Sequence, residues 1–127
     1  MTPKLSKLEL QIMELLWSRG ECCIRDIVDA FPARKKPAYT TIQTTIYRLA
    51  AKKALRQSRK VGNVHLFEPL IARNAAQRRL VDEFLGLFGG QALPLMTHLI
   101  ESGRLSSDDL KEAQKAFQRL SKKGETQ

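Results

Sequence analysis

The chain has 127 residues, of which 43% are hydrophobic, and its 22 basic and 13 acidic side chains give a net charge of +9. This length favours one domain or two small units, and the charge favours a polyanionic partner. No run approaches the roughly 18 apolar residues that span a bilayer, and Glu9 and Glu14 interrupt the first apolar stretch, so we expect neither a membrane segment nor a signal peptide. The only cysteines, Cys22 and Cys23, are adjacent, which favours a cytoplasmic protein without disulfides.

The charge is distributed unevenly along the chain. Residues 1–70 hold 13 basic and 6 acidic side chains, whereas residues 71–127 hold 9 and 7. Between Arg34 and Lys60 there are nine basic residues and no acidic one. The first half is therefore the candidate nucleic-acid surface, and the nearly neutral second half needs another role.

Two helices are predicted before residue 32. Ser6 and Glu9 have the spacing of a capping box, which predicts that the first helix begins after Ser6, and Gly20 is its expected end. Residues 21–24 read as a short extended piece, and a second helix over residues 25–31 is stopped by Pro32. A basic turn over residues 33–38 follows.

A third helix is predicted over residues 39–54. At 3.6 residues per turn, one face holds Ile42, Ile46, Leu49 and Lys53, with Thr45 and Ala50 at its margins. The opposite face collects Thr40, Gln43, Thr44, Tyr47, Arg48 and Ala51. An apolar stripe backed by short hydrogen-bonding side chains suits a helix in a DNA major groove. Thr40 and Gln43 also fit a capping box, so Thr40 either caps the helix or contacts DNA.

The hydrophobic period changes after the third helix. Residues 55–60 and 64–68 read as two short strands around a turn at Gly62 and Asn63. Three helices followed by a basic hairpin give the order of a winged helix-turn-helix, whose wing tip spans residues 59–63. We therefore predict a mostly α fold with a small β-hairpin, in which residues 1–70 form a winged-helix DNA-binding domain.

The remainder of the chain is predicted to be helical. Helices are expected from Ala72, over residues 93–102 and after Ser106, where Asp109 completes a capping pattern. Their apolar face is larger than three short helices can bury, which predicts a dimerisation region over residues 71–122, followed by a polar tail over residues 123–127. In the alternative, these helices cover the back of the winged helix in the same chain. The residues expected at the dimer interface are Leu80, Phe84, Leu87, Phe88, Leu95, Leu99, Leu110 and Phe117.

Several motifs resemble the penicillinase-repressor (BlaI/MecI) family. They are LSKLELQIMELLW at residues 5–17, RDIV at 25–28, AYTTIQT at 38–44, Arg48 followed by Leu49, PL at 69–70 and LSSDDL at 105–110. The resemblance covers nearly the whole chain, and the motif at residues 38–44 is its most specific part. It implies a bacterial transcriptional repressor with an N-terminal winged helix and a helical dimerisation region, which binds operators of two-fold symmetry.

The resemblance also implies the DNA-contacting residues. Positions that match the family's recognition helix are Thr40, Thr41, Gln43, Thr44 and Arg48, and Arg59 and Lys60 match its wing. Gln43 can pair with base edges, Thr44 can contact a thymine methyl, and Arg48 can hold phosphate or guanine. Tyr47 replaces a smaller polar residue that is common in the family, and we include it among the contacts. Lys36 and Lys52, from the basic segment, complete the expected backbone contacts.

Other features also depart from the family pattern. Ala54 stands where the family commonly has a glycine after the third helix. Antibiotic-responsive members are cleaved at an Asn-Phe bond, and the matching pair here is His98 and Leu99, so the resemblance does not predict release by that cleavage. The copper-responsive branch carries C-terminal cysteines, which this chain lacks, and metal-driven release by that route is excluded.

The sequence shows no catalytic or metal-binding pattern. His65 and His98 are far apart without a cysteine or histidine at ligand spacing, and no phosphate loop or nucleophile motif is present, so we expect no cofactor, no metal and no enzyme. Cys23 falls at the cap of the second helix, where a small structural residue is favoured over a redox sensor.

Two function classes remain open. The first is a dimeric, sequence-specific repressor that occupies an operator. The second is a winged-helix module that binds nucleic acid without sequence preference or binds a protein partner. The two differ in specificity, because a repressor should prefer its site by roughly 10³-fold or more over random DNA.

Overall fold

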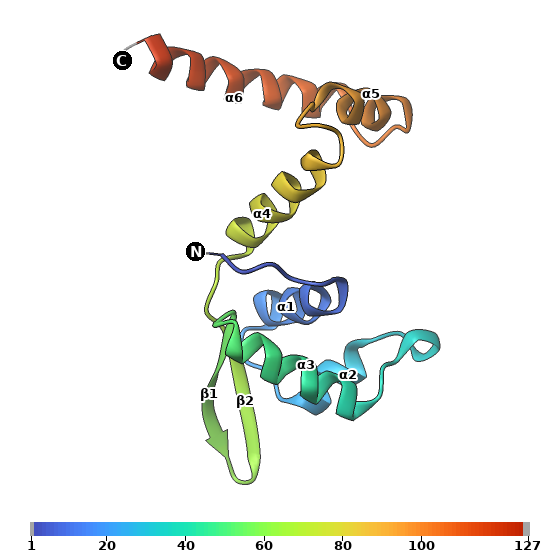
Figure 1. Cartoon of the computed structure of the whole chain (residues 1–127), viewed down its shortest axis with the longest axis vertical. Helices are drawn as coiled ribbons and strands as arrows, with labels where there is room; N and C mark the ends of the chain where they lie inside the picture. Colours follow the sequence, from blue (N-terminus) through green and yellow to red (C-terminus); the bar gives the residue numbers. More distant parts are fainter. Residues whose placement is uncertain (1, 126–127) are drawn as a thin grey trace. The chain divides into compact units, whose positions relative to one another are not determined.

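The computed structural model describes residues 2–125 and shows two compact units, Met1–Glu83 and Phe84–Gln127. The elements in chain order are α1 (Lys7–Arg19), α2 (Ile24–Ala30), the short 3-10 helix η1 (Ala33–Lys35), α3 (Tyr39–Ala51), β1 (Leu55–Val61), β2 (Val64–Pro69), α4 (Arg73–Gly86), α5 (Leu93–Glu101) and α6 (Ser107–Glu125) (Figure 1). The predicted class is confirmed, since the fold is mostly helical with one antiparallel hairpin. The winged-helix order of elements in the first unit is also confirmed.

The first unit has a closed apolar core made by α1, α2, α3 and the base of the hairpin. Ile12 and Leu16 of α1, Ile27 of α2 and Ile46 and Leu49 of α3 have no exposed surface. The predicted capping box starts α1, because the Ser6 hydroxyl accepts from the Glu9 amide (3.2 Å) and the Ser6 amide donates to the Glu9 carboxylate (2.8 Å). The apolar stripes read from the sequence therefore meet in one core.

The hairpin is anchored to the helical body by a backbone bridge. Cys22 and Phe67 exchange two backbone hydrogen bonds (3.0 and 2.9 Å), so the extended piece before α2 pairs with β2. Within the hairpin, Gln57 faces Phe67 and Arg59 faces Leu66, which leaves Ser58 as an extra residue in a β-bulge. The bridge and the bulge were not predicted, and both set how the wing leaves the body.

The third helix ends earlier than predicted, at Ala51 instead of residue 54. Lys53 has a φ of 62°, its amide donates to the Ala50 carbonyl oxygen (3.0 Å), and the Ala54 amide donates to that of Leu49 (2.9 Å). This is a Schellman motif with lysine in the left-handed position that glycine usually takes. The placement of Lys53 on the core-facing stripe was therefore wrong, and its side chain is exposed.

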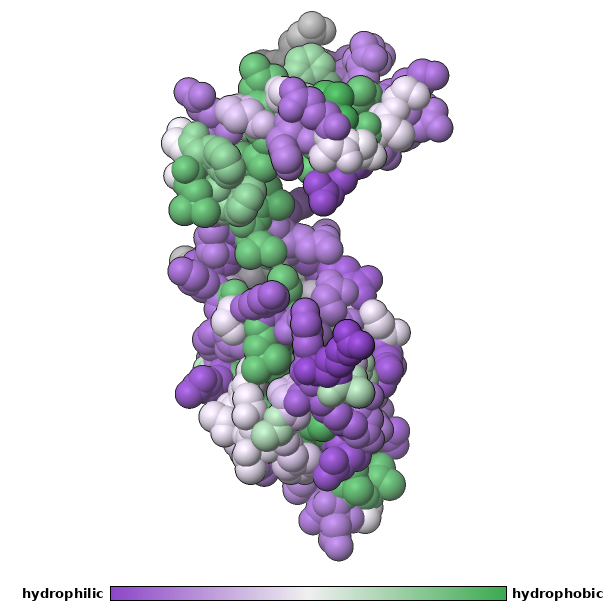
Figure 2. Space-filling view, turned by 90° about the vertical axis from the view of Figure 1, so that its right-hand side faces the viewer, coloured by the Kyte–Doolittle hydropathy of each residue, from purple (hydrophilic) through white to green (hydrophobic). Residues whose placement is uncertain are grey.

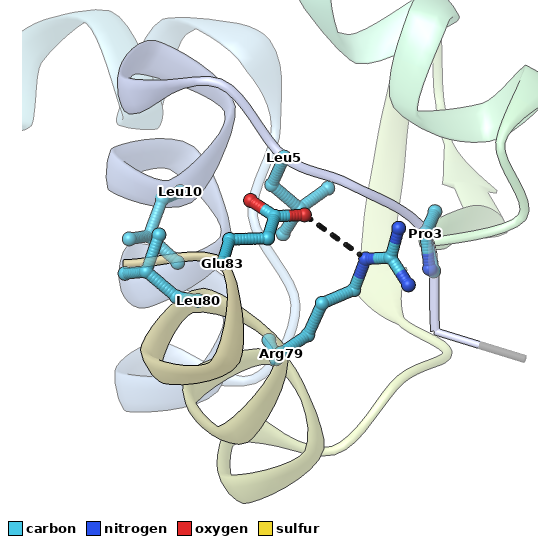
Figure 3. A pocket seen from close by; sticks show the side chains of 7 residues that line it. Pro3, Leu5, Leu10, Arg79, Leu80 and Glu83 are labelled. Atoms are coloured by element: carbon cyan, nitrogen blue, oxygen red, sulfur yellow. Dashed lines mark ion pairs between the residues drawn. The ribbon is translucent and has the colours of Figure 1, made fainter. Parts of the chain in front are cut away.

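The first turns of α4 belong to the first unit. The Trp17 indole donates to the Ile71 carbonyl oxygen (2.9 Å), and Ala76 is buried. Leu10 of α1 and Leu80 of α4 both line a cavity of about 10 Å³ (Figure 3), hardly enough for one water molecule. The compact unit thus extends to Glu83, and the division into domains at residues 70 and 71 stays a prediction.

The second unit lacks a closed core. From residue 84 to residue 123, none of the described side chains is buried. Its α6 begins with the predicted capping box, in which the Ser106 amide and hydroxyl pair with Asp109 (3.0 and 3.1 Å). This helix continues to Glu125, so the segment expected to be a polar tail is helical that far. Apolar side chains gather on the surface of this unit, in the upper part of Figure 2.

Candidate nucleic-acid interface

One face of α3 presents the predicted recognition residues to solvent. Its opposite face lies in the core through Ile42, Ile46 and Leu49. Thr45 is also buried, and its hydroxyl donates to the Thr41 carbonyl oxygen (2.7 Å). The outward face holds Thr40, Thr41, Thr44, Tyr47 and Arg48, all exposed, with Gln43 half-buried. The structure thus brings all six predicted recognition residues together on one surface.

Thr40 does not cap the helix. The N-cap residue of α3 is Ala38, and no side chain makes a capping hydrogen bond there. Thr40 lies inside the helix, one residue after its first residue, so the capping role considered for Thr40 is not observed. Its hydroxyl remains exposed beside that of Thr41.

The basic segment between Arg34 and Lys60 lacks acidic residues in sequence but not in space. Carboxylates from outside the segment pair with four of its nine cations. The pairs are Lys36 with Asp29 (3.1 Å), Lys52 with Glu9 (2.6 Å), Arg56 with Glu68 (2.6 Å) and Arg59 with Glu21 (3.1 Å). The positive surface is therefore smaller than the sequence suggested.

Five cations of this segment have no acidic partner among the described residues. They are Arg34, Lys35, Arg48, Lys53 and Lys60, all exposed. Of the four residues predicted for the wing and backbone contacts, only Lys60 belongs to this group. Lys36, Lys52 and Arg59 each have a carboxylate partner, which reduces the charge they present to a phosphate.

Lys52 has a structural role at the end of α3. Its ammonium group donates to both carboxylate oxygens of Glu9 (2.6 and 2.8 Å) and to the Lys4 carbonyl oxygen (3.0 Å). Glu9 is only 4% exposed. Burial opposes ionisation of Glu9, but hydrogen bonds from Lys52 and Ser6 outweigh it and hold the pKa of Glu9 below its ordinary value. Lys52 thereby ties α3 to α1 and to the N-terminal segment.

Arg59 is held by a residue that lies before α2. Its guanidinium contacts both carboxylate oxygens of Glu21 (3.1 and 3.2 Å), and the Ser58 hydroxyl donates to the same carboxylate. These bonds, first from Ser58 and then from Arg59, lower the pKa of Glu21. Glu21 therefore stays ionised beside the wing.

A groove lies between the outward face of α3 and the wing, and it contains residues that the sequence analysis missed. The Arg25 guanidinium stacks over the Tyr39 ring, 4.9 Å from its centre. The side chains that line the groove are those of Cys23, Ile24, Arg25, Tyr39, Gln43, Tyr47, Asn63, Val64, His65 and Phe67. No sequence pattern links Arg25 to Tyr39, because helix packing alone brings α2 and α3 together.

Comparisons with known proteins identify the family of this chain. Residues 5–119 match the family model described as penicillinase repressor. The chain belongs to the penicillinase repressor family. The transcriptional regulator BlaI of Mycobacterium tuberculosis strain H37Rv is 30% identical over 120 residues, which cover 92% of this chain and 85% of that protein. The penicillinase repressor of Staphylococcus aureus is 23% identical over 121 residues, 94% of this chain and 95% of that one.

A solved structure of a relative matches part of the chain. The solution structure of the DNA-binding domain of the repressor BlaI has a TM-score of 0.50 and 27% identity, and the match covers 57% of this chain and 88% of that one. The chain is therefore a winged-helix member of a family of transcriptional regulators, and not an enzyme.

The described residues also bear on the other features expected from the sequence. Among residues 2–125 no cluster of three or more histidine, cysteine or acidic side chains could hold a metal ion, and none of the helices described there has the length and apolar character to cross a bilayer. Cys22 is 1% exposed, and burial raises the pKa of its thiol. His98 and Leu99, which replace the family's cleavage pair, lie within α5.

Proposed function

We propose that this penicillinase repressor family member is a dimer that represses transcription by occupying a DNA operator of two-fold symmetry. The observation that carries the proposal is the outward face of α3, where six polar or cationic side chains are exposed or half-buried on a helix fixed by its buried face. The match to the DNA-binding domain of the repressor BlaI supports the same use of this surface.

In this proposal α3 enters the major groove and the wing lies along the neighbouring backbone. Gln43, Thr44 and Arg48 read base edges, since amide, hydroxyl and guanidinium groups match the donors and acceptors displayed there. Thr40, Thr41 and Tyr47 contact backbone or bases at the margins of the helix. Phosphates are held by the four other unpaired cations, Arg34, Lys35, Lys53 and Lys60. Arg25, stacked on Tyr39, joins them at the groove.

Dimerisation through the second unit explains why its apolar residues are exposed. Leu87, Phe117 and Leu120 are 79%, 70% and 69% exposed, values that an isolated folded unit rarely shows on three large side chains of one small region. Phe84 and Phe88 add a pair of packed rings, 5.3 Å between centres, that is also exposed. A second copy of the same helices would cover these side chains, and two chains would then present two recognition helices to two half-sites.

The proposal is tested by selecting bound sequences from a random duplex library at near-physiological salt. The expected result is an enriched motif with two-fold symmetry, preferred by roughly 10³-fold or more over random DNA. The Gln43→Ala variant should change base preference at one position, whereas Lys60→Gln should weaken all duplexes alike and reduce the salt dependence. Binding without any enriched motif would favour the non-specific module. A cytoplasmic location stays a prediction.

A further inference from the structure

Glu21 is an acidic residue that lies beside the proposed DNA surface. Its side chain is 32% exposed, and its carboxylate accepts hydrogen bonds from the side chains of Ser58 and Arg59 in β1. The neighbouring Cys22 pairs with Phe67 of β2 through two backbone hydrogen bonds, which fixes Glu21 against the hairpin. A carboxylate fixed at this position competes with DNA phosphates for Arg59.

The β-bulge makes this contact possible. In a regular strand, consecutive side chains point to opposite faces, so Ser58 and Arg59 could not both reach one carboxylate. The extra residue at Ser58 breaks that alternation, and both side chains reach Glu21. An irregularity in the strand is thus associated with holding Arg59, a cation that the wing would otherwise present to DNA.

The pairing of Arg59 with Glu21 reduces the number of wing cations that are available to phosphates. Arg56 is paired with Glu68 in the hairpin itself, so among the described wing residues Lys60 is the one cation without a carboxylate partner. The Arg59 side chain is 63% exposed, and an exposed ion pair is weak enough to be exchanged for a phosphate. Non-specific DNA binding depends almost entirely on such phosphate contacts, whereas operator binding gains further from base edges.

We propose that Glu21 is a specificity-determining residue that holds Arg59 away from phosphates in complexes with non-operator DNA. This inference rests on the proposed function. In the operator complex, α3 is seated in the major groove and the wing is pressed on the backbone, where Arg59 exchanges Glu21 for a phosphate. On non-operator DNA, α3 is not seated, the exchange does not occur, and the wing binds with Lys60 alone. Glu21 therefore widens the difference in affinity between operator and other sequences.

The test measures dissociation constants for the selected operator and for a random duplex of equal length, over a series of salt concentrations. With Glu21→Gln we expect random-duplex affinity to rise about 3- to 10-fold at low salt and the slope of log K against log salt to steepen by about 0.9, the value for one added phosphate contact. Operator affinity should rise less, with its slope unchanged, so the specificity ratio falls.

A double-mutant cycle identifies the partner of Glu21. In the Arg59→Gln background, Glu21→Gln should no longer alter random-duplex affinity, and thermal unfolding of each variant checks that it is folded. The inference is overturned if Glu21→Gln leaves random-duplex affinity unchanged, if its effect persists without Arg59, or if operator and random duplex gain equally. Failure of the proposed function is a separate result. If the wild-type chain binds duplexes without an enriched motif, the proposed function fails, and the effect of Glu21→Gln on random-duplex affinity shows independently whether Glu21 holds Arg59 away from phosphates. A wild-type chain that binds no duplex overturns both.

Discussion

The two units of this chain differ in how much apolar surface they bury. In Met1–Glu83, three helices and a hairpin enclose a core in which Ile12, Leu16 and Ile46 are fully buried. In Phe84–Gln127, no described side chain up to residue 123 is buried, and Phe117 is 70% exposed. Since hydrophobic burial is the main force that stabilises folded proteins, the first unit is stabilised by its own core, and under the proposed function the second unit is stabilised by association with another copy.

Helix α4 joins these two kinds of unit within one element. Near its start, Arg73 bonds to Glu14 (3.3 Å) and to Ser18 (3.1 Å), and Ala76 is 5% exposed. Near its end, Phe84 is 48% exposed. The boundary between the two units therefore lies within α4, where burial of its side chains ends. Substitutions before and after this boundary should differ in their effect on the stability of the first unit.

The largest expected effect comes from a charge placed in the buried part of α4. Ala76→Asp should lower the free energy of unfolding of the first unit by about 3 kcal/mol, because an unpaired carboxylate would be buried beside α1. Gln77→Asp, an exposed position one residue later, is the matched control and should change it by less than about 0.5 kcal/mol. Urea unfolding followed by circular dichroism measures both. Equal effects would show that α4 does not belong to the first unit.

A charge in the exposed apolar face of α6 should act on association and leave the first unit folded. Phe117→Glu is expected to give a monomer. Its binding to a two-fold operator should weaken by about 100-fold, since the two half-sites are no longer bound by one linked dimer. Gln118→Glu adds the same charge one residue away, and we expect it to remain a dimer with nearly unchanged affinity.

Sedimentation equilibrium and operator titration measure these two variants side by side. If Phe117→Glu remained dimeric, the exposed apolar face of α6 would not be the association surface. If Gln118→Glu also dissociated, the effect would be one of charge alone.

The ion pair between Glu9 and Lys52 gives the first unit an acid-sensitive contribution to stability. Because the pKa of Glu9 is lower in the folded state, this contribution is present above the ordinary pKa of the carboxyl group and is lost as pH falls through the lowered value. Glu9→Gln should cost about 1–2 kcal/mol at neutral pH, less than a fully buried pair, because the Lys52 side chain is 37% exposed.

The control for this pair is Glu14→Gln on the same helix. Glu14 pairs with Arg73 at the surface, where both side chains are more than 40% exposed, and its loss should change stability by less than about 0.5 kcal/mol. Denaturant unfolding at several pH values should show a weaker decline in acid for Glu9→Gln than for the wild type. Parallel declines would mean that Glu9 does not contribute to acid sensitivity.

The features predicted correctly from sequence are local or periodic. Ser6 and Glu9 are three residues apart, as are Ser106 and Asp109, and both capping boxes are present. The apolar stripe of α3 depends on helical spacing alone, and the hairpin turn depends on Gly62 and its φ of 61°. Such features follow from the properties of one short segment, so the sequence contains them directly.

The features that were missed depend on contacts between distant segments. Arg59 and Glu21 are 38 residues apart, and Lys52 and Glu9 are 43 apart, so no spacing rule connects them. The segment between Arg34 and Lys60 does hold nine cations and no acidic residue. In the folded protein, however, carboxylates from other segments lie beside four of these cations. Helical periodicity and the family resemblance both predicted the outward face of α3, yet neither could reveal which wing cations have carboxylate partners.

The junction after α3 gives the smallest and sharpest test of the first unit. The sequence drew attention to Ala54, but the residue that adopts the left-handed conformation is Lys53, at φ 62°. Lys53→Gly should raise the free energy of unfolding by about 0.5–1 kcal/mol. Glycine removes the steric cost of this conformation, and the greater entropy of glycine in the unfolded state cancels part of that gain. Lys53→Ala keeps the steric cost and should give no such gain, so the difference between the two variants isolates the backbone effect.

Both variants remove the same unpaired cation, and therefore both should weaken binding to random duplexes equally, whatever their stability. If alanine stabilised the unit as much as glycine, the gain would come from removing the lysine charge beside Lys52 and not from the helix end.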